Sequence, residues 1–369
     1  MSRVGIAGFG QTKFSEDDSK IESVLLKTTK NLLDSTSNLS QKDIDAVLVS
    51  TNNNSKYLSA ILSEMTSIQP KISHSIESLC NSGTNAIVAA YSYIVSGLAE
   101  VVLISGAERY DSPGQILEWD NLRGEFKHPI FWASIFSKSY KRKYSISDED
   151  LALVSVKNHK QSIHNPFAIS QKAVSIDDVL NSKKLTEDLR LLECSRPCTG
   201  GASILLASEN SCNTFTDNPV WITGIGQKTT SASFTKIPSF DTMESTRQAA
   251  HSAFQMSKQK PTDIDVMEIH DAFAVCEPMA LDSMGFSTSG KGIELVKEAY
   301  FSENYKISPR GGLIGSGHPL GATGIAQTIE ITQQLQSQAE KRQVDNAKVG
   351  LVHNMSAAST SSTVLVLEK

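Results

Sequence analysis

The amino-acid sequence predicts an α/β protein whose strands are covered by helices on both faces and whose second half repeats the first. Three observations support this prediction: short apolar runs rich in β-branched residues, longer segments of helical period between them, and three sequence echoes in a constant order. Strands buried on both faces give continuous apolar runs. Their alternation with helical segments is typical of a sheet with helices on both sides.

Four apolar runs in the first part of the chain have the length and composition of buried strands. These predicted strands are residues 4–7, 46–49, 101–104 and 203–207. Predicted helices occupy residues 20–39, 84–96 and 148–164. Residues 86–107 carry one charge, Glu100, but Ser96 and Gly97 signal the end of a helix. We therefore expect a buried helix and then a buried strand there, and no membrane span.

The second half repeats three segments of the first. Residues 4–11 recur as 221–227, residues 43–50 as 263–270, and residues 100–105 as 348–353. Three echoes in the same order indicate an internal duplication. The polar stretch 208–219 marks the junction, so we expect one unit at residues 1–212, with an inserted loop region of about 110–165, and a second at residues 213–369.

The composition argues against several classes of protein. A net charge of −5 does not suit a nucleic-acid binder. Five cysteines in 369 residues do not suggest a disulfide framework, and Cys194 and Cys198 lack the second pair that a zinc site needs. We therefore expect no metal site. The N-terminus does not have the pattern of a signal peptide, so we also expect a cytoplasmic protein.

One local exception is a basic run between residues 138 and 144, with tyrosines interleaved. Its members are Lys138, Tyr140, Lys141, Arg142, Lys143 and Tyr144. A solvated helix face is the simpler interpretation, and a patch that meets the phosphates of a ligand is the alternative.

Cys80 lies where an extended segment turns through small residues into an apolar helix. The backbone N–H groups and the dipole of a helix N-terminus stabilise an anion, so this position favours a reactive thiolate. Gly83 would allow close approach of a substrate, and neighbouring N–H groups could hold an oxyanion. A small buried cysteine that begins a core helix is an equally good interpretation of this segment alone.

His318 lies in a glycine-rich segment, residues 311–324, that leads into a predicted helix at residues 325–336. The glycine spacing matches neither a dinucleotide-binding loop nor a P-loop. A histidine held rigidly by glycines suits general base catalysis or hydrogen-bond donation. A buried structural histidine is the alternative.

Two further polar segments follow predicted strands. His270 and Asp271 stand at the carboxyl end of a strand, where open α/β sheets commonly place active sites, although His270 could instead cap the next helix. Residues 353–357 are expected between the last two strands.

The four segments together resemble the thiolase superfamily, most closely the sterol-carrier-protein-type thiolases and their archaeal relatives. Residues 317–324 are similar to that family's histidine loop, and Cys80-Asn-Ser-Gly is similar to its nucleophilic cysteine turn. His270-Asp-Ala-Phe resembles the His-Asp-Cys-Phe motif of this branch. The similarity extends from residues 8–14 to the final strand.

This resemblance implies a thiolase fold, with two duplicated βαβαβαββ halves packed as a five-layer αβαβα sandwich. It implies catalysis on acyl-coenzyme A, with coenzyme A as part of the substrate and no separate cofactor. Cys80 would take the acyl group with His318 as its base, while His270 and His318 bind the enolate oxygen. Ser316, Gly317 and Ser356 are expected beside the thioester.

The resemblance also implies a homodimer or homotetramer. Archaeal relatives can assemble with a hydroxymethylglutaryl-CoA synthase and a small zinc-ribbon and oligonucleotide-binding-fold protein, so a similar complex is expected here.

The sequence departs from the family at the second acid/base of the carbon–carbon step. Many thiolases carry a second cysteine in a Cys-X-Gly motif, where this chain has residues 354–356, Asn-Met-Ser. The cysteine of the His-Asp-Cys-Phe motif is replaced by Ala272, which has no proton to give. Cys276, about one helical turn later, is a possible substitute. Residues 356–362 are rich in serine where relatives have glycine, so their side chains would crowd the site or present hydroxyls to the ligand.

Three functions therefore stay open. The first is an acyl-CoA C-acyltransferase that condenses two acetyl-CoA molecules to acetoacetyl-CoA or runs the reverse thiolysis. The second is a non-catalytic thiolase-like scaffold or partner subunit. The third is an acyl-CoA transferase or hydrolase that uses Cys80 without a carbon–carbon step. A cavity shared by Cys80 and His318 favours an enzyme, whereas one blocked by Met355 or the serine-rich loop favours a scaffold.

Overall fold

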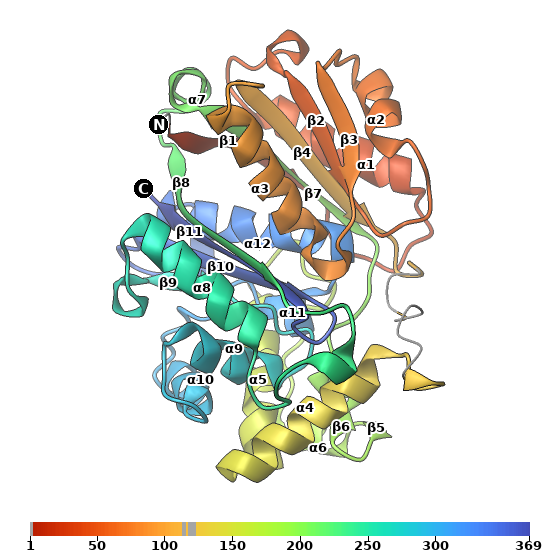
Figure 1. The fold of residues 1–369 in the computed structure, drawn as a ribbon, viewed down its shortest axis with the longest axis vertical. Helices are drawn as coiled ribbons and strands as arrows, with labels where there is room; N and C mark the ends of the chain where they lie inside the picture. Colours follow the sequence, from red (N-terminus) through yellow and green to blue (C-terminus); the bar gives the residue numbers. More distant parts are fainter. Residues whose placement is uncertain (1–2, 113–115, 117–122) are drawn as a thin grey trace.

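Two α/β halves share one nine-stranded sheet (Figure 1). The computed structural model describes residues 3–112, 116 and 123–369. The strands are β1 (Val4–Gln11), β2 (Ala46–Ser50), β3 (Ile72–Ile76), β4 (Val101–Glu108), β5 (Lys184–Thr186), β6 (Leu189–Arg190), β7 (Gly200–Ser208), β8 (Val220–Thr229), β9 (Val266–Glu268), β10 (Val349–Ser356) and β11 (Ser361–Glu368). The helices are α1 (Ile21–Ser35), α2 (Leu58–Thr66), α3 (Ser82–Val95), α4 (Pro129–Tyr144), α5 (Asp148–Ser162), α6 (Ile176–Asn181), α7 (Glu209–Phe215), α8 (Glu244–Ser257), α9 (Cys276–Met284), α10 (Gly292–Phe301), α11 (Gly312–Ser316) and α12 (Leu320–Leu335). The strands and helices predicted for the first half are all present, with ends shifted by a few residues.

The sheet topology confirms the internal duplication. The strand order is β3-β2-β4-β7-β1-β8-β11-β10-β9. In the first half, β1 pairs antiparallel with β7, β7 antiparallel with β4, and β4 parallel with β2. In the second half, β8 pairs antiparallel with β11, β11 antiparallel with β10, and β10 parallel with β9. The three sequence echoes correspond to β1 with β8, β2 with β9, and β4 with β10. The counterpart of β3 is reduced to one parallel bridge between Met267 and Ile307.

The two halves meet where β1 pairs antiparallel with β8, at Gly5–Trp221 and Ile6–Val220. The predicted limit at residue 212 falls inside α7, between the last strand of the first half and the first strand of the second. The exact boundary stays a prediction.

Helices cover both faces of the sheet and separate its two halves into layers. In β2, Ala46 and Leu48 belong to one core cluster and Val47 and Val49 to another, because successive side chains of a strand point to opposite faces. α1 and α2 pack on the outer face of the first half, and α8 and α9 on the outer face of the second. α3 and α12 lie between the halves, with α12 against β4, β7 and β10. The layers therefore run αβαβα.

The inserted region of the first unit folds mainly into α4 and α5, which pack against the second half (Figure 1). Residues 113–115 and 117–122 of this region lie outside the described residues. In the basic run of α4, Lys138 and Lys141 form ion pairs with Asp188, and Lys143 with Asp241. These pairs favour the solvated helix face over a phosphate-binding patch.

The segment with few charges, residues 86–107, forms most of α3 and then β4, as expected. Within the described parts of the chain, we find no helix that combines the length and the apolar character needed to span a bilayer.

Candidate active site

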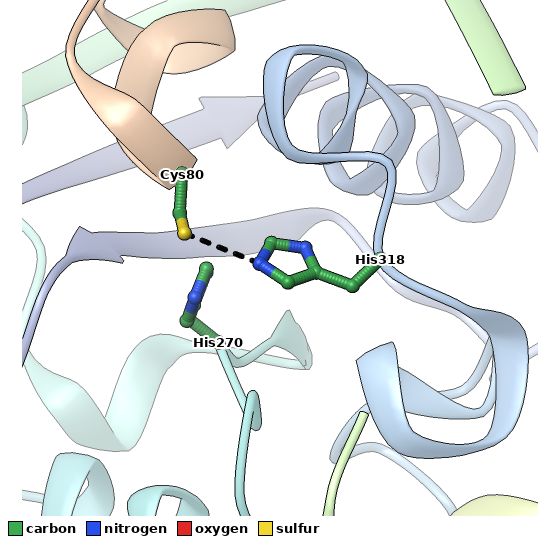
Figure 2. A group of neighbouring side chains, drawn as sticks. All are labelled: Cys80, His270 and His318. Carbon is green, nitrogen blue, oxygen red and sulfur yellow. Dashed lines mark hydrogen bonds between the residues drawn. The ribbon is translucent and has the colours of Figure 1, made fainter. Parts of the chain in front are cut away.

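Cys80 lies on a tight turn between β3 and α3, in a single 3-10 turn formed by Leu79–Asn81. Leu79 adopts a left-handed conformation with φ of +52°, which is unusual for a residue with a side chain. Hydrogen bonds hold the turn: Leu79 N–H donates to Glu77 Oε1 at 2.7 Å, and Leu79 O accepts from Asn52 Nδ2 at 2.9 Å. The backbone geometry therefore orients Cys80 away from the regular helix and toward the second half (Figure 2).

His318 stands in the connection between α11 and α12. The preceding residue, Gly317, has φ of +101°, and a Cβ there would lie 2.9 Å from Cys198 Sγ and 3.1 Å from Ile169 Cγ2. His318 N–H donates to Arg196 O at 2.9 Å, which ties the loop to the segment before β7. Close packing thus requires glycine at position 317 and holds the imidazole in place.

Cys80 and His318 form the central contact of the site. Cys80 Sγ lies 3.2 Å from His318 Nε2 (Figure 2). On the other side of the ring, Nδ1 lies 2.7 Å from Thr323 Oγ1, whose hydroxyl donates to Pro319 O at 3.1 Å. Because Thr323 uses its proton on Pro319, Nδ1 of His318 must be the donor to Thr323. Nε2 is then the unprotonated nitrogen and accepts the proton of the Cys80 thiol.

The electrostatics of this pair differ from the sequence-based expectation. Burial raises the pKa of the Cys80 thiol to about 12, and the carboxylates of Glu108 and Glu77 act in the same direction. Burial also lowers the pKa of His318 to about 3, with the charge of Arg310 as a second cause. Desolvation thus favours a neutral thiol, in the opposite direction to the helix N-terminus, and the thiolate expected from the sequence stays a prediction. Burial of both groups favours a resting pair of a neutral thiol and a neutral imidazole.

His270 approaches the same point from the end of β9. Its ring packs edge-on against that of His318, with 5.1 Å between centroids (Figure 2). Nδ1 of His270 is buried and has no hydrogen-bond partner among the described residues. Burial, together with His318 and His353, lowers the pKa of His270 well below its usual value. His270 is thus a neutral, buried imidazole and not the helix cap that the sequence left open.

Asp271 fastens the His270 segment to the His318 loop. Asp271 accepts hydrogen bonds from the backbone N–H groups of Leu313 at 2.5 Å and Ile314 at 3.3 Å, in α11. Asn158 Nδ2 donates to the same carboxylate at 2.6 Å. Burial, with Glu277 as the next cause, raises the pKa of Asp271 to about 7. One buried carboxylate therefore links the segment of His270 to the helix that precedes His318.

Residues 353–356 lie inside β10 and not between the last two strands, which corrects the prediction. His353 bonds Thr246 Oγ1 through Nε2 at 3.0 Å, and Asn354 Nδ2 donates to Gln327 Oε1 at 2.7 Å. The Ser356 hydroxyl donates to Ser78 O, next to the Cys80 turn. β10 therefore supports the site through hydrogen bonds from its side chains to neighbouring segments of the protein.

The serine-rich loop after β10 does not fill the site. Ala357, Ala358 and Ser359 all have positive φ, at 31°, 60° and 55°. The hydroxyl of Ser359 bonds with Ser245 at 2.8 Å, inside the second half. We expected hydroxyls of this loop to turn toward the ligand. The hydroxyl of Ser359 does not, because it forms its hydrogen bond with Ser245 of the second half.

A cavity of about 270 Å³ opens beside Cys80, His270 and His318. Its other polar lining residues are His128, Cys194 and Ser195. The remaining lining residues are mostly apolar: Leu79, Pro129, Ile130, Trp132, Leu185, Leu191, Pro197, Ala272, Phe273, Leu320, Met355 and Ala357. Met355 and Ala357 form part of the wall and leave the cavity open.

Several predicted positions lie elsewhere. Ser316 and Gly317 are not among the described residues that line the cavity, and the Ser316 hydroxyl donates to Arg310 O at 2.5 Å. The Ser356 hydroxyl donates to Ser78 O. Its neighbours in sequence, Met355 and Ala357, line the cavity, so a contact of Ser356 with the thioester stays a prediction. Cys276 is buried in the core of the second half and is not in the described lining, which argues against its role as substitute acid/base.

The sequence reasoning missed Cys194, which does line the cavity. In the sequence, Cys194 is notable only as half of a possible zinc-binding pair with Cys198. No motif marks its place, because its position depends on pairing between segments far apart in the chain.

Cys80, His270 and His318 also resemble a metal-ligand set, since one ligand atom of each lies within 4.8 Å of the others. A tetrahedral zinc ion has bonds of about 2.0–2.3 Å, so its ligand atoms lie roughly 3.3–3.8 Å from one another. The 3.2 Å between Cys80 Sγ and His318 Nε2 is also the length of a thiol–imidazole hydrogen bond, which suits direct proton transfer.

Comparisons with known proteins identify the family of the chain. A family model described as the thiolase N-terminal domain matches residues 4–192, and one described as thiolase C-terminal domain-like matches residues 226–369. Acetyl-CoA acetyltransferase of Methanothermobacter thermautotrophicus is 28% identical over 100% of both chains. Sterol carrier protein 2 of Oryctolagus cuniculus is 32% identical over 78% of this chain and 56% of that protein, so the chain spans about half of this relative.

Two solved structures share the fold. An Ltp2-ChsH2(DUF35) aldolase has a TM-score of 0.89 at 20% identity, with 100% of this chain and 98% of that chain covered. A monomeric SCP2-thiolase-like protein from Mycobacterium smegmatis has a TM-score of 0.79 at 14% identity, with 99% and 77% covered. The two family models together span almost the whole sequence, and the chain therefore belongs to the thiolase family.

Proposed function

We propose that this protein is an acyl-CoA C-acyltransferase that forms or cleaves a carbon–carbon bond through an acyl group on Cys80. The observation that carries the proposal is the 3.2 Å contact between Cys80 Sγ and His318 Nε2 in a cavity shared with His270. A nucleophile, its base and a further polar group are the parts that acyl transfer requires.

Acylation begins with proton transfer within this pair. As Cys80 Sγ attacks the thioester carbonyl, its proton moves to His318 Nε2. His318 then returns the proton to the departing coenzyme A thiolate. The Nδ1–H bond to Thr323 keeps the ring oriented while its charge changes.

His270 and His318 are proposed to bind the enolate oxygen in the carbon–carbon step. His270 is a buried neutral imidazole with one N–H to donate. His318 uses its Nδ1–H on Thr323, so it donates to the enolate oxygen from Nε2 while that nitrogen holds the proton taken from Cys80. Hydrogen bonds to developing negative charge are strong in a site that excludes water.

Acetyl-CoA is the proposed donor, in condensation to acetoacetyl-CoA or the reverse thiolysis, because relatives of similar length are named acetyl-CoA acetyltransferases. The cavity of about 270 Å³ has an apolar wall and holds roughly nine waters at ~30 Å³ each. It is therefore large enough for acyl groups longer than acetyl, and acyl-CoA thioesters of increasing length belong in the same assay.

A second candidate is acyl transfer to another acceptor, or thioester hydrolysis, through Cys80 alone. Ala272 and residues 354–356 favour it, because these positions lack the thiol that relatives use in the carbon–carbon step. A non-catalytic scaffold is a weaker candidate, because Met355 leaves the cavity open.

The test combines mass spectrometry with kinetics. The protein is incubated with acetyl-CoA, digested and searched for an acetyl group on Cys80, while thiolysis of acetoacetyl-CoA is followed in parallel. Cys80→Ala is expected to abolish both signals, and Cys212→Ala, in α7 away from the cavity, is the matched control. An adduct without thiolysis would support the second candidate. If folded wild-type protein shows neither the adduct nor thiolysis, both enzyme candidates are rejected and the non-catalytic scaffold remains.

The assembly is a separate part of this proposal. We infer a homodimer or homotetramer, and a complex with a hydroxymethylglutaryl-CoA synthase and a zinc-ribbon/oligonucleotide-binding-fold protein. Light scattering after size exclusion, alone and after co-expression with such partners, tests both. A single monomer mass under all these conditions would reject them.

A further inference from the structure

The carbon–carbon step needs a group that exchanges a proton with the α-carbon of the acyl-CoA, and the residues already assigned do not supply it. His318 serves Cys80, and His270 and His318 face the enolate oxygen. Ala272 and Asn354, at the positions where relatives carry a thiol, have no acidic proton to exchange. The other polar residues in the described lining are His128, Cys194 and Ser195.

Cys194 lies on a segment that is fastened to both histidine segments. It forms an antiparallel bridge with Phe273, three residues after His270, and Pro197 forms a parallel bridge with His318. Ser195 N–H donates to Ala272 O at 2.8 Å, and Ala274 N–H donates to Glu193 O at 2.8 Å. These backbone bonds hold Cys194 directly across from the segment that contains Ala272.

The hydrogen-bond pattern also brings the Cys194 side chain close to that segment. The two backbone bonds flank the Cys194–Phe273 pair without joining it, so this is a non-hydrogen-bonded pair. In such pairs the Cα atoms are about 4.5 Å apart and the side chains are closer than in hydrogen-bonded pairs. Cys194 and Phe273 both line the cavity. A thiol is therefore present beside the position that Ala272 leaves without one.

The alternatives within the lining are less suitable. His128 caps α4, where its Nδ1 accepts the N–H of Ile130 at 3.3 Å, so that nitrogen is already used. The hydroxyl of Ser195 is a far weaker acid than a thiol and has no base assigned to it. His270 supplies the second observation that points to a ligand here: its Nδ1 is buried, lacks a described partner and lies in the same cavity.

We propose that Cys194 is the second acid/base of the carbon–carbon step and acts from the segment opposite Ala272, in place of the thiol missing there. This inference rests on the proposed thiolase activity. It assigns a catalytic role to a residue outside the motifs that identify the family in this chain.

The proton balance follows for the cleavage direction. Cys80 gives its proton to His318 Nε2 and attacks the keto carbon of a 3-ketoacyl-CoA. The bond between the α- and β-carbons then breaks, and the electron pair leaves on the acetyl-CoA enolate. The Cys194 thiol gives its proton to the α-carbon, which releases acetyl-CoA and leaves a thiolate. Incoming coenzyme A gives its thiol proton to Cys194 and attacks the acyl group on Cys80, and the departing Cys80 sulfur takes back the proton held by His318. Both cysteines then return to their starting states.

The resting protonation state of Cys194 agrees with this role. Its Sγ lies 3.3 Å from Arg190 O, to which the thiol donates. Burial raises the pKa of the Cys194 thiol to about 12, with Glu193 as the second cause. The residue therefore carries a proton at neutral pH and is prepared for the cleavage direction.

The test separates acylation from proton exchange at carbon. Wild type, Cys194→Ala and Cys194→Ser are compared in three assays: acetylation of Cys80, thiolysis of acetoacetyl-CoA, and exchange of the α-protons of acetyl-CoA in D₂O. We expect both cysteine variants to keep Cys80 acetylation. Thiolysis and exchange should fall by roughly 100- to 10,000-fold, the usual contribution of a catalytic acid/base.

Two further variants sharpen the comparison. Cys212→Ala removes a buried cysteine far from the cavity and should leave all three assays unchanged. Cys194→Ala combined with Ala272→Cys returns a thiol from the opposite segment and should recover part of the thiolysis and exchange. Retained acetylation shows that each variant is folded.

The outcomes distinguish this inference from the proposed function. If wild type is acetylated and active in thiolysis, and Cys194→Ala keeps that activity, Cys194 is not the acid/base and the thiolase activity stands. If folded wild type shows neither thiolysis nor exchange, the proposed function and the role of Cys194 are both rejected.

Discussion

Asp271 accepts a hydrogen bond from the backbone N–H of Leu313 at 2.5 Å, and this contact joins the strand that ends at His270 to the helix that leads to His318. The two residues belong to segments about forty positions apart, and their contact links the two segments that carry the histidines. A further donor, Asn158, comes from α5 in the first unit. The candidate active site is thus assembled by buried polar contacts as well as by the sheet.

Asp271→Asn should weaken both the fold and acylation. An amide has one acceptor oxygen, so at least one of the buried donors at this position loses its partner, at a cost of roughly 1–3 kcal/mol. Because α11 then shifts, acetylation of Cys80 should slow as well. Urea unfolding and adduct formation measure the two effects. Asp34→Asn, at an exposed position, is the control and should change stability by less than about 0.5 kcal/mol.

Gly317→Ala should destabilise the protein by roughly 1–3 kcal/mol and displace His318, because φ at this position is +101° and the new methyl would meet Cys198 Sγ at 2.9 Å. Gly97→Ala is the matched control, since its φ is +75° but nothing lies within 4 Å of the new methyl. Thermal unfolding of both variants separates backbone strain from the clash. Adding Cys198→Ala to Gly317→Ala should recover only the clash component; full recovery would contradict the strain argument.

Cys80 should react slowly with iodoacetamide at neutral pH and faster as the pH rises. Its folded pKa is raised from 9.0 to about 12, so the thiolate fraction keeps increasing well above pH 9. Initial rates of labelling at Cys80, measured by mass spectrometry from pH 6 to pH 10, test this. A rate that levels off below pH 8 would instead indicate a resting thiolate–imidazolium pair.

His353 should make the protein less stable in acid. Burial lowers its pKa from 6.5 to about 3, so between these pH values the unfolded chain binds a proton that the folded protein does not. Stability from this residue is therefore lost as the pH falls through that window, by up to about 1.4 kcal/mol per pH unit.

His353→Asn removes this titration and should flatten the dependence of unfolding free energy on pH between about 6.5 and 3, relative to wild type. The exposed His251→Asn is the control and should leave the slope unchanged. Equal slopes in wild type and His353→Asn would show that His353 is protonated in the folded state.

Much of the architecture follows from local sequence patterns. The apolar β-branched runs placed the strands of the first half, and the three echoes anticipated the repeated strand order from β1 and β8. Cys80, His318 and His270 could be named because glycines and small residues mark the turns that carry them. Residues 353–356 were predicted to lie between the last two strands because the run is polar. They lie in β10, where their polar side chains form hydrogen bonds with other parts of the protein, and a local pattern does not show such partners.

The sequence by itself determined the elements, the duplication and the three residues of the site, since these depend on short-range periodicity and on local turn chemistry. Only the tertiary structure shows that burial raises the pKa of Cys80, because desolvation depends on everything packed around the thiol. Only the tertiary structure brought Cys194 into the cavity, through backbone pairing with Phe273 across about eighty residues. Burial and pairing between distant segments are properties of the packed chain, and no local run of residues encodes them.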